Sequence, residues 1–424
     1  MKYKELYDFL NIYKNISSHE FHMLPLCAAE NISSDFVKLP HSSFLQEKYI
    51  LGGIMEYLQN DNFHGSQNLF DIYTTFQKQC NKMFNCVYSD ARTLSGLNAI
   101  TTVLMALFEI GDTLLITSPE YGGHSSMQLI CDRLGLKTIF LPYDYDKKDF
   151  DYDQINLILN NEKIKGILVA LSDMIEHPHL EKIKLNDSIL IYDATQILGL
   201  IATKYIENPF EWFSDRDNVI LMGATHKTIP GPTCGLIMTQ NISLAKKLDL
   251  KVNPDYLRNV QLNNIVSLLF ALYELEYYGQ DYFGVMKKLI NETALQLNDK
   301  IEIIKTRDND FSKTHQLWLS VDKNRLSNLE KNSSLLDVSL NVRNRRIYNT
   351  QGVRLGFQQI ARFNWNIKAA SLVAEILLSL THSKCNYNKT QKMIKELPPK
   401  KLHFIFEETI TDEVYKILHN CNLH

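Results

Sequence analysis

The hydrophobic pattern of the chain predicts an α/β domain built on a mostly parallel sheet. From about residue 85, short runs of apolar and often β-branched residues alternate with helix-length segments. The runs are almost continuously hydrophobic, which is typical of strands that are covered on both faces. This rhythm indicates strands connected by helices. The predicted strands are Thr113–Thr117, Lys137–Leu141, Gly166–Leu171, Ser188–Tyr192, Val219–Met222 and Gly235–Met238.

Two helices of this domain are predicted from apolar residues that recur at spacings of three and four. Ser95–Phe108 comes just before the first predicted strand, and Gly111 is expected to cap its C-terminus. Asn263–Tyr277 shows a similar pattern and is expected to link the large domain to a smaller one.

After about residue 290 the pattern predicts a smaller α+β domain. His315–Asp322 and Leu336–Val342 are its predicted strands, and Lys368–Leu380 is a predicted helix. The lysine-rich tail after Ser383 ends in periodic apolar residues, so we expect it to be folded. The predicted division is a helix and arm at 1–40, a large domain at 41–285 and a small domain at 286–424.

Composition and charge favour a soluble cytoplasmic enzyme. The chain has 424 residues, 45% of them hydrophobic, and its 45 basic and 48 acidic residues give a net charge of −3. That balance argues against a broad nucleic-acid surface. Apolar runs such as Ile265–Tyr273 are far shorter than the roughly 20 residues of a membrane helix, and no signal peptide is expected. The seven cysteines form no CxxC pair, so we expect reduced thiols and no metal site.

The segment Gly223–Gly235 (GATHKTIPGPTCG) carries the most chemical information. It places Lys227 just beyond the predicted strand Val219–Met222, at the sheet edge where α/β proteins bind ligands. Asp193 ends another predicted strand. A lysine and an acid at adjacent strand ends suit pyridoxal phosphate, because the lysine forms a Schiff base and the acid keeps the pyridine nitrogen protonated. The alternative is a buried Lys–Asp ion pair.

An ordered series of motifs resembles the serine hydroxymethyltransferases, which are fold-type I pyridoxal-phosphate enzymes. The series runs from about residue 24 to 380, and its order is more specific than any one motif. Its members are LCAAENISS (Leu26–Ser34), LSGLNA (Leu94–Ala99), EIGDTLL (Glu109–Leu115), YGGH (Tyr121–His124), DATQILGLIA from Asp193, ATHKTIPGP from Ala224 and GVRLG (Gly352–Gly356).

The resemblance implies the cofactor contacts. Lys227 would hold pyridoxal phosphate, and Asp193 would pair with its pyridinium nitrogen. Ser95 and Gly96 open a helix whose free N–H groups can bind the phosphate, although an ordinary N-cap would look the same. The other implied contacts are Leu97, Tyr121 in place of the family's ring-stacking histidine, Ser172, Gln196 and Thr225.

The resemblance also implies a substrate site and a homodimer, because the family's active sites are completed across the subunit interface. Arg354 would clamp the substrate α-carboxylate, a bidentate task that suits a guanidinium. Tyr49 is a retained catalytic tyrosine, and His226 either shuttles a proton or supports the loop. The remaining implied substrate contacts are Glu30, His64 and His124, the last of which could instead be merely hydrogen-bonded.

Several departures from the family point away from folate. Leu51 stands at the position of the family's catalytic glutamate, and leucine cannot exchange a proton. Glu56 could replace that glutamate after a local insertion. The segment Asn341–Gly352 is shorter than the family's loop that helps to shape the folate site. Further substitutions of family residues are Ala29, His64, Leu97, Gln196 and Thr233, and the diglycine that a neighbouring subunit lends to the phosphate is absent around Arg258.

The sequence therefore predicts aldol-type chemistry at Cα of glycine, serine, threonine or a related amino acid, with an aldehyde acceptor and no obligatory folate. Three alternatives stay open. They are ordinary folate-dependent serine hydroxymethyltransferase, a pyridoxal-phosphate aminotransferase or decarboxylase, and a non-catalytic homologue. The amino acid, the electrophile and the pathway are left undefined by the sequence.

Overall fold

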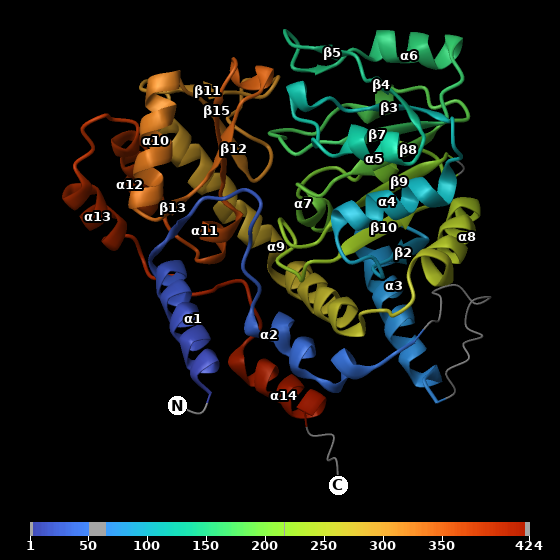
Figure 1. Ribbon diagram of the computed structural model, residues 1–424, viewed down its shortest axis with the longest axis horizontal. Helices are drawn as coiled ribbons and strands as arrows, with labels where there is room; N and C mark the ends of the chain where they lie inside the picture. Colours follow the sequence, from blue (N-terminus) through green and yellow to red (C-terminus); the bar gives the residue numbers. More distant parts are fainter. Residues whose placement is uncertain (1–2, 51–64, 216, 420–424) are drawn as a thin grey trace. The chain divides into compact units, whose positions relative to one another are not determined.

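Figure 1 shows the computed structural model, which describes residues 3–50, 65–215 and 217–419. The chain forms two compact units. The larger unit comprises Ala29–Phe283 and Phe404–His424, and the smaller unit comprises Met1–Ala28 and Gly284–His403. The helix α9 (Leu262–Leu297) contributes residues to both. The domain boundaries predicted from the sequence stay a prediction.

The larger unit contains a seven-stranded sheet in the order β2-β10-β9-β8-β7-β3-β4. Only β10 is antiparallel to its neighbours, and the other pairs are parallel. The strands are β2 (Tyr88–Asp90), β3 (Thr113–Ile116), β4 (Lys137–Phe140), β7 (Gly166–Ala170), β8 (Ile189–Asp193), β9 (Val219–Ala224) and β10 (Gly235–Thr239). The six predicted strands are thus confirmed, with ends that differ by one or two residues. The strand β2 was not predicted, because three residues are too few to show a pattern.

Several helices of the larger unit, among them α3, α4, α5 and α8, pack on this sheet. The helix α4 contacts β9 and β10, and its buried side chains join those of the strands in one hydrophobic core. The helices are α2 (Asp35–Lys38), α3 (Phe70–Phe84), α4 (Gly96–Leu107), α5 (Met127–Arg133), α6 (Tyr152–Asn161), α7 (Leu198–Ala202), α8 (Ile242–Leu250) and α14 (Glu408–His419). The strands β5 (Tyr143–Asp144) and β6 (Asp149–Phe150) form a separate antiparallel pair between β4 and α6 in the sequence.

The predicted helix at Ser95–Phe108 is confirmed, but the predicted cap at Gly111 is wrong. The helix α4 ends at Leu107, and Phe108 already has the extended backbone of a C-cap residue. Gly111 lies further on, with φ of +92°, in the turn that leads into β3. Glycine is suited to that turn because its backbone readily adopts positive φ.

The smaller unit is built on a four-stranded antiparallel sheet in the order β11-β12-β15-β14. Its strands are β11 (Glu302–Ile304), β12 (Gln316–Ser320), β14 (Asn341–Arg343) and β15 (Gly352–Gly356), and a separate parallel pair joins β1 (Leu24–Pro25) to β13 (Val338–Ser339). Its other helices are α1 (Lys4–His22), α10 (Lys323–Leu335), α11 (Gln358–Arg362), α12 (Ile367–Leu380) and α13 (Tyr387–Lys395).

The single strand predicted at Leu336–Val342 is two strands, so this prediction is wrong in part. Val338–Ser339 pairs with β1, whereas Asn341–Arg343 pairs with β15. The chain changes partners at Leu340, a tertiary event that a continuous apolar run does not reveal. The predicted helix at Lys368–Leu380 and the predicted folded tail are both confirmed.

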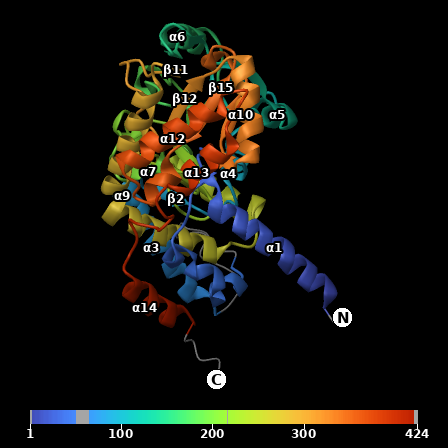
Figure 2. The ribbon, with the colours of Figure 1, turned by 90° about the vertical axis from the view of Figure 1, so that its left-hand side faces the viewer.

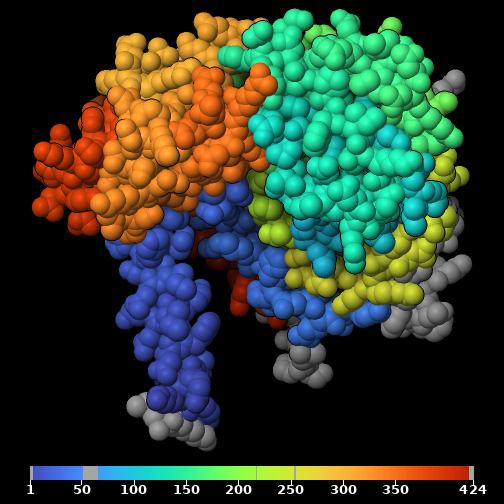
Figure 3. Space-filling model, turned by 45° about the horizontal axis from the view of Figure 1, so that its top comes forward, coloured from blue at the N-terminus to red at the C-terminus, as the bar shows by residue number. Residues whose placement is uncertain are grey.

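None of the residues of the helix α1 is buried, a property that it shares with α14. In Figures 2 and 3 it extends away from the other elements of the smaller unit. Apolar side chains at Leu6, Phe9, Leu10 and Tyr13 recur at helical spacing and are 45–61% exposed. Among the residues that the structure describes, no helix combines the length and the apolar character needed to cross a membrane.

Candidate active site

Asp193 and the segment that carries Lys227 lie at the same edge of the large sheet. Asp193 is the last residue of β8 and pairs in register with Met222 of the parallel strand β9. Lys227 follows β9 by three residues. The Asp193 carboxylate is 7% exposed and accepts hydrogen bonds from the backbone N–H of Thr195, at 2.9 Å, and from the Thr195 hydroxyl. The structure therefore brings the two predicted residues to neighbouring strand ends.

The loop that holds Lys227 is closed by hydrogen bonds on both sides of the lysine. The Thr225 N–H donates to Cys234 O at 3.1 Å, the Thr225 hydroxyl donates to Pro232 O at 2.7 Å, and the Gly231 N–H donates to Thr225 O at 3.1 Å. Thr225 itself is fully buried. These bonds define the path of the chain from β9 to β10, so the lysine is carried on a well-supported turn.

Asn31 is a contact of this loop that the sequence reasoning missed. Its side-chain amide donates to the backbone carbonyl of Lys227 and to the Tyr282 hydroxyl, the latter at 3.1 Å. The neighbouring Ser33 hydroxyl donates to Gly231 O at 3.3 Å. A signal was available, because Asn31 belongs to the motif LCAAENISS, but roles were assigned only to its neighbours Ala29 and Glu30.

The N-terminus of α4 is held against the start of the lysine loop. The Ser95 hydroxyl accepts from the Asn98 N–H at 3.2 Å, and the Asn98 side chain accepts from the Leu94 N–H at 2.9 Å. Gly96 lies so close to β9 that a Cβ there would be 2.9 Å from the Ala224 Cβ. The N–H groups of Gly96 and Leu97 belong to the first turn, where a helix has no internal acceptors. They are therefore suited to an anion.

A buried ion cluster, also missed by the sequence reasoning, lies just before this turn. The Arg92 guanidinium donates to Asp90 at 2.6 Å and to Asp249 at 2.5 Å, and all three side chains are inaccessible to solvent. Beyond it, the Thr93 carbonyl accepts from the Gly235 N–H at 2.9 Å. This cluster could not be predicted from a local motif, because Asp249 comes from α8, far along the chain.

The segment of Tyr121 and His124 is attached to the end of β7. The His124 N–H donates to Ala170 O at 2.9 Å, and Ala170 pairs in register with Asp193. The Ser172 N–H donates to Gly122 O at 2.8 Å. These bonds bring His124 and Ser172, both predicted site residues, next to the strand that ends at Asp193.

Tyr121 is buried and already packed within the protein. Its ring stacks on Tyr143 with centroids 4.5 Å apart, and its hydroxyl donates to Leu141 O at 2.9 Å. Burial raises the pKa of this hydroxyl well above its ordinary value. One face of the Tyr121 ring is therefore occupied by a side chain of the same unit.

His226 lies beside Lys227 in a largely desolvated position. Its Nδ1 atom is buried and has no hydrogen-bond partner among the described residues. Burial, together with the positive charge of Lys227, lowers the pKa of His226 to about 4. The imidazole is therefore neutral near pH 7 and offers a buried nitrogen next to the lysine.

The other predicted site residues of the larger unit differ in their exposure to solvent. Gln196 is 2% exposed and lies three residues after Asp193, whereas Glu30 is exposed and Tyr49 is 42% exposed. His64, and with it Leu51 and Glu56, lies outside the described residues.

Arg354 belongs to the smaller unit, at the centre of β15. It is 3% exposed, pairs in register with Trp318 and Asn341, and donates from Nη2 to Asn341 Oδ1 at 3.1 Å. The same Asn341 oxygen accepts from the Ala28 N–H at 3.3 Å. The guanidinium is thus oriented by a side-chain amide that is itself held by the backbone.

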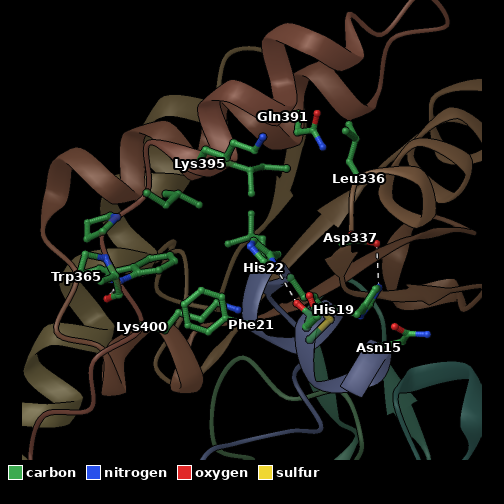
Figure 4. Close-up of a pocket in the computed structure, with 17 residues that line it drawn as sticks. Asn15, His19, Phe21, His22, Leu336, Asp337, Trp365, Gln391, Lys395 and Lys400 are labelled. Carbon is green, nitrogen blue, oxygen red and sulfur yellow. Dashed lines mark hydrogen bonds and ion pairs between the residues drawn. The ribbon is translucent and has the colours of Figure 1, made fainter. Parts of the chain in front are cut away.

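A pocket of about 630 Å³ in the smaller unit contains none of the predicted site residues. Figure 4 shows it between the C-terminal half of α1 and α13 with the residues that follow that helix, and His22, Lys395, Lys400 and Trp365 lie around it. The His19 imidazole is 2.8 Å from Asp337, and Lys400 donates to Glu20 O at 2.8 Å. These contacts attach α1 to the rest of the smaller unit.

The residues of the larger unit fit pyridoxal phosphate. The absence of a side chain at Gly96 lets the start of α4 pack directly against Ala224 of β9, and the first-turn amides of α4 suit a phosphate. The buried Asp193 carboxylate suits a protonated pyridine nitrogen, and Lys227 supplies an amine on the adjacent loop. The described residues contain no cluster of histidine, cysteine and acidic side chains that could hold a metal ion.

Comparisons with known proteins agree with this fit. A family model described as serine hydroxymethyltransferase matches residues 4–270. A serine hydroxymethyltransferase of Methanobrevibacter smithii is 29% identical and covers 90% of this chain and 92% of its own. One of Archaeoglobus fulgidus is 25% identical, with 88% and 86% covered. The crystal structure of L-threonine transaldolase from Pseudomonas fluorescens, in its internal aldimine state, matches with a TM-score of 0.87 at 20% identity over 98% of both chains.

Proposed function

This chain belongs to the serine hydroxymethyltransferase family, and on that premise we propose that it makes or breaks the Cα–Cβ bond of a small amino acid without requiring folate. Its fold is the α/β fold-type I, its cofactor is pyridoxal phosphate, and it is a transferase or lyase of that group. The proposal concerns the bond, the substrate class and the independence from folate.

One observation carries the proposal: the lysine loop is retained, whereas the features that serve folate are altered. The Asp193 strand end, the Lys227 turn and the α4 N-terminus are each held by strand pairing, hydrogen bonds or close packing, and together they would bind the cofactor. Leu51 stands where the family has its catalytic glutamate, and the connection from β14 to β15 is only residues 344–351. Chemistry at Cα needs the residues that bind the cofactor. One-carbon transfer to folate also needs the catalytic glutamate and the longer loop, which this chain lacks.

Each side chain has a role in this proposal. When bound, pyridoxal phosphate supplies an electron sink for negative charge at the amino acid Cα. Asp193 would hold the proton on the pyridine nitrogen, and Arg354 would bind the α-carboxylate. Lys227, beside the neutral His226, would accept and return the proton at Cα. Tyr49 would serve as a second proton donor, at the oxygen of the aldehyde.

His124 is a better candidate than Tyr121 for the aromatic group that covers the cofactor ring. The Tyr121 ring is stacked on Tyr143 and its hydroxyl is bound at Leu141. The His124 backbone is instead bound to Ala170, which lies opposite Asp193 in the sheet. We therefore transfer the stacking role to His124 and give Tyr121 the role of supporting this segment.

A homodimer is part of the proposal. The exposed apolar stripe of α1 supports it, because a large apolar helix face on a soluble protein generally marks an interface. A second copy of the chain is the partner that the family resemblance implies.

The test is an assay of the purified protein with glycine, L-serine and L-threonine, with and without tetrahydrofolate. The proposal expects release of aldehyde from threonine or serine at rates that differ less than twofold when folate is added. Strong stimulation by folate that is abolished by Glu56→Gln would instead indicate an ordinary serine hydroxymethyltransferase. Accumulation of a keto acid or an amine would indicate transamination or decarboxylation.

A further inference from the structure

A segment near the start of the larger unit, residues 31–37, runs along one side of α9. Three side-chain hydrogen bonds join the two: Ser267 donates to Val37 O at 2.7 Å, Ser34 donates to Glu274 at 2.7 Å, and Asn31 donates to Tyr282 at 3.1 Å. The three residues of α9 recur at spacings of about two helical turns, so they lie on the same side of the helix. All six residues belong to the larger unit. The helix therefore holds the segment in place along its length.

The side chain of Asn31 connects this helix to the lysine loop. Its amide nitrogen donates one hydrogen bond to the Tyr282 hydroxyl and another to the backbone carbonyl of Lys227. Its amide oxygen accepts from the Ile32 N–H at 2.8 Å. Tyr282 is fully buried. Because a side-chain amide has two N–H donors and both are engaged here, the orientation of the Asn31 side chain is fixed.

Lys227 lies between two threonines that are held independently of Asn31. Thr225 is bound within the loop, as described above, and the Thr228 hydroxyl accepts from the Gly199 N–H at 3.1 Å. A Cβ at Gly199 would come within 2.3 Å of Thr228 O, so the start of α7 packs directly on this residue. Both threonines are fully buried, whereas Lys227 is partly exposed. Asn31 therefore binds a carbonyl that lies between two fixed points of the loop.

A hydrogen bond to the carbonyl of Lys227 restricts the direction of the lysine side chain. The carbonyl belongs to the planar peptide group that follows the lysine Cα, so fixing that plane restricts rotation about the Cα–C bond. The lysine stem is long and flexible, and the region that its amine can reach depends on where the Cα–Cβ bond points. A displacement of about 1 Å between reacting groups can lower a rate about a hundredfold.

We propose that Asn31 is a positioning residue for Lys227, which acts through the lysine carbonyl and directs the amine toward the cofactor aldehyde and the substrate Cα. Tyr282 supports this role by accepting from the same amide. The inference rests on the proposed function, in which Lys227 holds pyridoxal phosphate and exchanges the proton at Cα. Asn31 orients the lysine and transfers no proton itself, because a neutral amide does not titrate.

The experiment compares two ligands that differ in their ability to react with the lysine. Pyridoxal phosphate condenses with an amine and loses water, whereas pyridoxine phosphate has an alcohol in place of the aldehyde and cannot form this bond. In Asn31→Ala, the loss of one hydrogen bond should raise the dissociation constant of pyridoxal phosphate about tenfold and leave that of pyridoxine phosphate within about twofold of the parent value. Calorimetric titration of the cofactor-free protein measures both constants.

Exchange of the glycine Cα proton in deuterated water gives a second readout. In Asn31→Ala we expect kcat to fall by about tenfold to a hundredfold while KM for glycine changes less than about twofold, because the misplaced lysine slows proton transfer and leaves glycine binding intact. Asn31→Asp keeps the oxygen that accepts from Ile32 but lacks N–H groups to donate to Lys227 O, so it should show the same effects.

The control from the same segment is Ser33→Ala, which removes a hydrogen bond to Gly231 O and should keep the parent values for both ligands. Tyr282→Phe removes the hydroxyl that orients Asn31, and it should raise the dissociation constant of pyridoxal phosphate about threefold. Adding Tyr282→Phe to Asn31→Ala should cause no further increase, because both substitutions act through the same hydrogen bond to Lys227.

Equal weakening of the two ligands in Asn31→Ala and Asn31→Asp would give Asn31 a general structural role and overturn the inference alone. Unchanged binding of pyridoxal phosphate in both variants would overturn it as well. If neither variant folds, the same comparison of ligands in Tyr282→Phe decides between these results. A parent protein that carries the cofactor on another lysine after borohydride reduction would overturn the proposed role of Lys227 together with the inference.

Discussion

Gly96, the first residue of α4, lies so close to Ala224 at the end of β9 that a Cβ at position 96 would come within 2.9 Å of the Ala224 Cβ. This contact joins the helix N-terminus proposed for the cofactor phosphate to the strand that leads into the Lys227 loop. The N-terminus of α4 and the end of β9 therefore cannot shift relative to each other unless this contact is repacked.

Gly96→Ala should destabilise the protein by about 1–3 kcal/mol, because the added methyl group overpacks a backbone contact. It should also weaken the binding of pyridoxal phosphate, since the helix would have to shift from β9. Urea unfolding and a titration with the cofactor measure the two effects. Gly284→Ala is the matched control, because no atom lies within 4 Å of a Cβ there. In the middle of α9 it should stabilise by about 0.5–1 kcal/mol.

Asp193→Asn should abolish most of the chemistry while preserving the local structure. The amide keeps an oxygen that can accept from the Thr195 N–H and hydroxyl, but it loses the negative charge. We expect exchange of the glycine Cα proton in deuterated water, followed by NMR, to fall by about a hundredfold or more. Asp193→Ala should lose the same activity and also destabilise the fold by about 1–3 kcal/mol, because it leaves the Thr195 donors unpaired. Exchange at the parent rate in Asp193→Asn would make Asp193 a structural acid.

The sequence predicted the parts of the site that lie in continuous motifs at strand ends. Lys227 and Asp193 follow long apolar runs, and parallel strands bring their carboxyl ends to one edge. Arg92 and Asn31 were missed because their partners, Asp249 and the Lys227 carbonyl, come from distant segments or from the backbone. Neither kind of contact leaves a periodic pattern.

The same reasoning applies to the fold. Six of the seven strands of the large sheet were predicted because their hydrophobic runs reflect burial on both faces. The break at Leu340 was not predicted, because it arises when the chain exchanges β1 for β15 as its pairing partner. A hydrophobic pattern predicts which residues are buried, but it does not predict which strand they pair with.

The pH dependence of stability should reveal the buried imidazole of His226. Its pKa in the folded protein is lowered to about 4, below the ordinary value of about 6.5. Between these values the unfolded chain binds more protons, so stability falls as the pH decreases through this window and is constant in this respect above it. Urea unfolding of the cofactor-free protein at pH 7 and pH 5 should show a smaller loss in His226→Gln than in the parent. Equal losses in the two proteins would contradict the assignment.

The apolar stripe of α1 should be required for dimerisation. Replacing Leu6 and Tyr13 by lysine places two charges on the stripe, which should convert the proposed dimer to a monomer in light scattering after size exclusion. Both positions are more than half exposed, so the fold of the single chain should be unaffected. Asn11→Lys, which adds a charge away from the stripe, is the control and should remain dimeric. A dimer that survives the double substitution would exclude α1 as the interface.

We propose that Lys227 carries the cofactor at the edge of the large sheet. Borohydride reduction of the holoenzyme, followed by proteolysis and mass spectrometry of the labelled peptide, tests this assignment. We expect a pyridoxyl group on the peptide that contains Lys227, and its absence from Lys227→Ala, with the circular dichroism of that variant unchanged. A pyridoxyl group found reproducibly on another lysine would show that Lys227 is not the attachment site.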